Sequence, residues 1–81
     1  MIKETKKEME EIVRRIIAEE LQVRLDEVTL TAKIIDDLGA ESISVITIIS
    51  EIEDAFDVEI DYDDYDKVAT LNDILEVLST K

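Results

Sequence analysis

Apolar residues recur at three- and four-residue intervals in three stretches of the chain, a spacing that places them on one face of an α-helix. The first stretch carries its apolar positions at Met9, Ile12, Val13, Ile16, Ile17 and Leu21. Near its start, Thr5 and Glu8 have the spacing of a capping box, in which each side chain binds a free backbone N–H of the other residue. The pattern predicts a helix that begins near Thr5 and extends to Leu21.

The C-terminal stretch has the same features. Thr70 is a favourable helix-capping residue, and Asp73 follows it by three positions. The apolar positions of this stretch are Leu71, Ile74, Leu75 and Leu78. We therefore predict that the last element is also a helix.

The middle stretch is ambiguous at first sight, because residues 43–49 are mostly β-branched and have the composition of a strand. Its apolar positions nevertheless keep a helical spacing for three turns, at Val45, Ile48, Ile49, Ile52 and Phe56, with Ala55 alongside. Strand alternation fails over the same span. The unfavourable helix propensity amounts to only tenths of a kcal/mol per residue, and packing a full apolar stripe outweighs it. This stretch is predicted to be a helix.

Residues 22–40, between the first two helices, lack a helical pattern. Val23, Leu25, Val28 and Leu30 alternate with polar residues, as in a short strand, but no second strand is available to pair with it. We predict a long ordered loop that is pinned by these four residues and by Ile34, Ile35 and Leu38. A loop of this length is uncommon in a small domain and is often functional.

The acid-rich segment after Phe56 resembles a calcium-binding EF-hand loop in its acidity alone. Counted from Asp57, the position that needs glycine is Tyr62, and the position that needs glutamate is Val68. We therefore expect no specific metal site and only a short helical turn over residues 63–67. The predicted fold is a single all-α domain over residues 1–81, a small four-helix bundle with a long loop after the first helix and a short third helix.

Composition excludes several kinds of chemistry. The 81 residues contain no cysteine and no histidine, which removes disulfides, thiolate metal sites and the usual general base near pH 7. We expect that the chain is not an enzyme. Its net charge of −13 repels nucleic acid and anionic membranes and attracts basic protein surfaces, although such acidity also suits a merely well-solvated surface. No stretch suits a membrane span, and Met1–Glu4 does not resemble a signal peptide, so a cytoplasmic location is expected.

Ser42 stands at the predicted start of the middle helix. On a helical wheel Ile43 points away from the buried face, and Ile46 lies on the flank, one turn after Ser42. Either the preceding loop covers these isoleucines or they stay exposed beside the serine. Without histidine or a Walker motif, Ser42 is neither a triad nucleophile nor part of a nucleotide loop. It is either an ordinary first-turn residue or a place for a phosphate, which a helix N-terminus stabilises.

The segment IIDDLGAESISVITIISEIEDAFDVEI, residues 34–60, resembles the Asp-Leu-Gly-Ala-Asp-Ser-Leu signature of acyl carrier proteins and the helix behind it. The resemblance implies that Ser42 receives a 4′-phosphopantetheine group from coenzyme A through a phosphopantetheinyl transferase (holo-carrier synthase) that uses Mg²⁺. The thiol of this group would carry acyl intermediates as thioesters to acyl-transferring and synthase enzymes. The chain would then be a monomeric carrier, a substrate of its partner enzymes.

The sequence departs from the family pattern around the serine. Glu41 and Ile43 replace the family's Asp and Leu on either side of Ser42. The next turns carry Ser44, Thr47 and Ser50, where carriers of general fatty-acid synthesis usually have two acids and a methionine. For recognition by basic partners we predict a surface made of Glu41, Ile43, Ile46, Glu53 and Asp54.

Three functions remain open at this point. The chain is a carrier for fatty-acid synthesis or for a specialised lipid or polyketide pathway, an aminoacyl-type carrier, or an acidic helical interaction module that is never modified.

Overall fold

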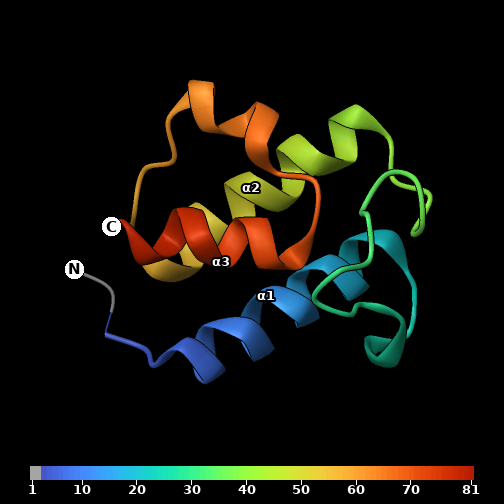
Figure 1. Cartoon of the computed structure of the whole chain (residues 1–81), viewed down its shortest axis with the longest axis horizontal. Coiled ribbons are helices and arrows are strands. Elements are labelled where there is room, and N and C mark those ends of the chain that lie inside the picture. The colour runs from blue at the N-terminus through green and yellow to red at the C-terminus, as the bar shows by residue number, and fades with distance from the viewer. Residues whose placement is uncertain (1–2) are drawn as a thin grey trace.

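The computed structural model describes residues 3–81; Met1 and Ile2, part of the N-terminal segment considered above, lie outside the described residues. The elements follow in the order α1 (Lys6–Leu21), η1 (Leu25–Glu27), α2 (Ser42–Phe56), η2 (Tyr62–Lys67) and α3 (Leu71–Ser79), where η marks a 3₁₀ helix. Figure 1 shows α1 along one edge of the molecule, and α1 packs against both α2 and α3. The predicted all-α fold with a long loop and a short third helix, η2, is confirmed.

The capping box predicted at Thr5 is formed, and Thr70, predicted to start the last helix, forms a second one with Asp73. The Thr5 hydroxyl accepts a hydrogen bond from the Glu8 N–H at 3.2 Å, and the Glu8 carboxylate accepts one from the Thr5 N–H at 2.9 Å. The Thr70 hydroxyl and the Asp73 carboxylate make the same exchange at the start of α3. Each box satisfies backbone N–H groups that have no partner within the helix.

The core is built from the three apolar faces predicted by periodicity. From α2 it contains Val45, Ile48, Ile49, Ile52 and Phe56, all of them buried. α1 contributes Met9, Val13, Ile17 and Ala18, and α3 contributes Leu71, Ile74, Leu75, Val77 and Leu78. Ala55, which we expected alongside the apolar face of α2, is exposed because it lies just outside the edge of that face.

The loop before α2 is ordered, but not in the way predicted. Val28 and Ile34 are buried, and Val23 and Leu38 are partly buried against the core. Three residues do not pin the loop: Leu25, Leu30 and Ile35 are exposed. The alternating stretch does not form a strand, because a 3₁₀ turn over Leu25–Glu27 interrupts the alternation.

Hydrogen bonds hold this loop where apolar contacts were expected. The guanidinium Nε of Arg14 on α1 donates to the carbonyl of Val28 at 2.7 Å. Further along the loop, the Ile34 N–H donates to the Ala69 carbonyl at 2.9 Å, next to an isolated β-bridge between Lys33 and Thr70. The loop is therefore tied to α1 and to the start of α3.

No helix within residues 3–81 combines the length and apolar character that a membrane crossing requires.

Candidate functional site

Ser42 is the first residue of α2, and the chain reaches it through a tight turn. Gly39 has φ of +77°, in the left-handed region that glycine adopts without strain, so the single glycine of the chain suits this turn. The N–H groups of Gly39 and Ala40 donate to the carbonyls of Ile35 and Ile34. Glu41 then has an extended conformation and precedes the helix without a side-chain capping bond.

The hydroxyl of Ser42 is accessible. The residue is exposed, and within the described part of the chain its side chain makes no hydrogen bond. Ile43 and Ile46 are 68% and 49% exposed. The loop therefore leaves both isoleucines uncovered, and the interpretation that they lie exposed beside the serine is confirmed.

A groove of about 450 Å³ opens beside Ser42. The loop, the start of α2, η2 and the segment after it all contribute to its wall, which consists of Lys33, Ile35, Asp36, Ser42, Val45, Ile46, Tyr62, Tyr65, Asp66, Val68 and Ala69. The rings of Tyr62 and Tyr65 stack with their centroids 5.1 Å apart, and Tyr62 is 81% exposed. Apolar and aromatic side chains line much of the groove, and Lys33, Asp36 and Asp66 add charged groups to its wall.

Sequence reasoning did not find several residues of this groove. Lys33, Tyr62 and Tyr65 lie 9 to 23 positions from Ser42 along the chain, and no local pattern links them to it. One signal was present: two of the three aromatic residues of the chain fall in an acid-rich segment, where core packing is not the expected use of a ring.

The predicted recognition acids have different surroundings. Glu41 and Asp54 are exposed. Glu53 is half-buried, and its carboxylate accepts a hydrogen bond from the Ile60 N–H at 2.8 Å. Within residues 3–81, no group of three or more acidic side chains is placed to hold a metal ion. The role of these acids in recognition stays a prediction.

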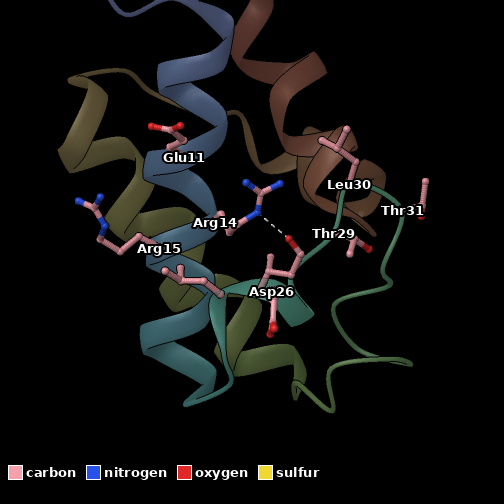
Figure 2. Close-up of a pocket in the computed structure, with 9 residues that line it drawn as sticks. Glu11, Arg14, Arg15, Asp26, Thr29, Leu30 and Thr31 are labelled. Atoms are coloured by element: carbon pink, nitrogen blue, oxygen red, sulfur yellow. Dashed lines mark hydrogen bonds between the residues drawn. The ribbon is translucent and has the colours of Figure 1, made fainter.

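A larger hollow, of about 800 Å³, lies away from this groove, between α1 and residues 25–31. Figure 2 shows Arg14 on α1 pointing toward the loop that carries Thr29 and Leu30, whereas Glu11 and Arg15 extend away from that loop. Arg14 is already bonded to Glu10 and to the Val28 carbonyl. The two hollows share no residue, so the larger one has no part in the chemistry of Ser42.

Comparison with known proteins identifies the family. A family model described as the phosphopantetheine attachment site matches residues 11–78. An acyl carrier protein from Desulforapulum autotrophicum is 44% identical over 70 residues, which cover 85% of this chain and 91% of that protein. The chain belongs to the acyl carrier protein family. The fold agrees: the acyl carrier protein from Enterococcus faecalis superposes with a TM-score of 0.80 at 34% identity, covering 96% of this chain and 100% of that one.

As an acyl carrier protein, the chain is a carrier and not an enzyme. The cofactor of the family is a covalently attached 4′-phosphopantetheine group, and its partners are phosphopantetheinyl transferases and acyl-processing enzymes. The site described above suits such a group, because it offers an exposed hydroxyl at a helix start with an open groove beside it.

Proposed function

We propose that Ser42 is the attachment site and that this acyl carrier protein presents acyl intermediates as thioesters on the attached arm. The observation that carries the proposal is the exposed Ser42 hydroxyl at the first position of α2, beside the groove. Ser44 is only partly exposed and Ser50 lies two turns further along the helix, away from the groove wall. Neither is as well placed for attachment.

The chemistry required of Ser42 is a single substitution at phosphorus. Its oxygen forms a bond to the phosphorus of the pantetheine phosphate in coenzyme A, and the bond to the leaving 3′,5′-ADP breaks. The transferase and its Mg²⁺ remove the serine proton and stabilise the leaving group. The carrier contributes only an accessible hydroxyl, which explains why a chain without histidine or cysteine can serve.

The surface around Ser42 would meet the partner enzymes. Ile43 and Ile46 form an apolar centre, and Glu41, Glu53 and Asp54 supply negative charge at its rim. Basic partner surfaces are attracted by such a rim, which mainly accelerates encounter, while the apolar centre contributes affinity. The carrier is proposed to act in this way as a monomer and as a single domain.

For the pathway we propose fatty-acid synthesis or a specialised lipid or polyketide route. Ser44 and Thr47 are partly exposed and Ser50 is exposed, and all three are uncharged. They favour a specialised route, with partners that recognise this altered face. The Thr47 hydroxyl is bonded to the Ile43 carbonyl at 3.1 Å, which leaves it less free to bind a partner. An aminoacyl cargo is the alternative.

Mass spectrometry of the intact protein tests the attachment site. The protein is incubated with coenzyme A, Mg²⁺ and a transferase of broad specificity, and it should gain one phosphopantetheinyl group. Ser42→Ala should abolish the gain, whereas the matched control Ser44→Ala should keep it. A Ser42→Ala protein that still gains the group would falsify the assignment.

A further inference from the structure

The arm on Ser42 introduces a negative charge where the carrier is already strongly acidic. Seven of the nine basic residues precede Ile34, and only Lys67 and Lys81 follow it. Asp36 and Asp66 line the groove at Ser42, and Glu41 directly precedes the serine. The N-terminus of α2 favours a phosphodiester at this place, but these carboxylates repel it, and a nearby cation would offset the repulsion.

Among the described residues that line this groove, Lys33 is the one basic residue. Its backbone is fixed, because its N–H donates to the Asp37 carboxylate at 2.8 Å and it forms the bridge to Thr70. Its side chain is exposed, and within residues 3–81 it has no carboxylate at ion-pair distance. Lys67, by contrast, is paired with Asp64 at 3.3 Å.

We propose that Lys33 forms an ion pair with the phosphodiester of the phosphopantetheine arm on Ser42. This ion pair would keep the phosphate end of the arm over the groove. This inference rests on the proposed attachment at Ser42. A phosphodiester carries one negative charge at neutral pH and offers two free oxygens to an ammonium group. The first part of the arm then runs along the wall formed by Ile46, Tyr62 and Tyr65.

The pair lies at the surface, so its effect is modest and depends on salt. The salt dependence provides a test. For each variant, the apo form without the arm is the reference. The change in the melting temperature Tm on adding the arm is compared among the wild type, Lys33→Met, Lys33→Arg and Lys7→Met. Lys7 on α1 is exposed and lies outside the groove, so Lys7→Met removes the same charge elsewhere.

At low salt, adding the arm should lower Tm by about 1–5 °C more in Lys33→Met than in the wild type. The excess should vanish at about 0.5 M salt, where the charges are screened. Lys33→Arg and Lys7→Met should behave like the wild type. The ³¹P resonance of the phosphodiester should shift in Lys33→Met and remain unchanged in Lys7→Met.

Two failures are distinguishable. If the wild type does not gain the arm at Ser42, the proposed function is wrong. If the arm is added but Lys33→Met shows the wild-type change in Tm and an unshifted ³¹P resonance, the ion pair is overturned while the carrier function stands.

Discussion

One carboxylate oxygen of Glu53 accepts a hydrogen bond from the backbone N–H of Ile60 at 2.8 Å, across the turn that follows α2. The carbonyl of Glu53 also accepts from Val58, and Asp57 ends the helix in the left-handed conformation. The backbone carbonyl and the side-chain carboxylate of Glu53 therefore both bind the turn that follows α2. Since η2 begins two residues after Ile60, this contact helps to set where Tyr62 and Tyr65 lie relative to Ser42.

Replacing Glu53 should therefore destabilise the fold. Glu53→Ala leaves the N–H of the buried Ile60 without its partner, which costs about 1–3 kcal/mol of unfolding free energy. Asp54→Ala removes a neighbouring charge that is exposed and should change stability by less than about 0.5 kcal/mol. Urea unfolding of both variants measures the difference, and equal stabilities would contradict the structural role of Glu53.

Ile46 is expected to affect partner enzymes more than stability. Because Ile46 is half exposed, Ile46→Ala should change the unfolding free energy little, whereas Ile48→Ala on the buried face should cost about 2–5 kcal/mol. A partner that desolvates Ile46 gains about 1–3 kcal/mol, so Ile46→Ala should lower transferase kcat/KM by about 5- to 100-fold.

The control for this prediction is Asp54→Asn, which removes a rim charge that is not tied to the fold. At moderate salt it should lower kcat/KM less than Ile46→Ala does, because rim charges are screened. A loss of several kcal/mol of stability in Ile46→Ala would mean that Ile46 belongs to the core. It would contradict the proposal that partner enzymes recognise this residue.

Salt should stabilise the carrier. Its net charge of −13 acts on a small core, and residues 57–66 concentrate acids on the segment that includes η2. Raising the salt to about 0.5 M should raise Tm by screening this repulsion. Millimolar Ca²⁺ or Mg²⁺ should also raise Tm through weak binding to residues 57–66 and to the acids of residues 51–54. A Tm unmoved by either addition would count against charge repulsion as a limit on stability.

The capping box of α1 should make part of the stability depend on pH. The backbone N–H of Thr5, and secondarily its side chain, hold the pKa of Glu8 below its ordinary value of 4.5. A lowered folded-state pKa means that this stabilisation is present above pH 4.5 and is lost as pH falls through the lower folded value. Glu8→Ala should therefore melt below the wild type at pH 7, and the gap should narrow in acid.

Glu11→Ala is the matched control for Glu8. Glu11 is an exposed acid on the same helix, outside the capping box. The difference in Tm between Glu11→Ala and the wild type should therefore not change as the Glu8 carboxylate is protonated. The idea fails if the Glu8→Ala gap stays constant between pH 7 and acid.

Local sequence determined most of the secondary structure. The capping boxes at Thr5 and Thr70 are formed by residues three positions apart, so a short window of sequence is sufficient to predict them. The helical spacing from Val45 to Phe56 correctly outweighed the strand composition, because one continuous apolar face can be buried only as a helix. A helical wheel placed Ile43 away from the buried face and Ile46 on its flank, and both are exposed; whether the loop would cover them could not be decided from the sequence.

Contacts between distant segments decided the rest. Leu25, Leu30 and Ile35 are as apolar as the buried residues near them, yet they are exposed. The loop is held instead by a hydrogen bond that Arg14 donates to it and by one that the Ala69 carbonyl accepts from it. Lys33, Tyr62 and Tyr65 reach the groove at Ser42 only once the loop and η2 have packed beside α2. Periodicity shows which face of an element is buried, but the partner of that face depends on the path of the whole chain.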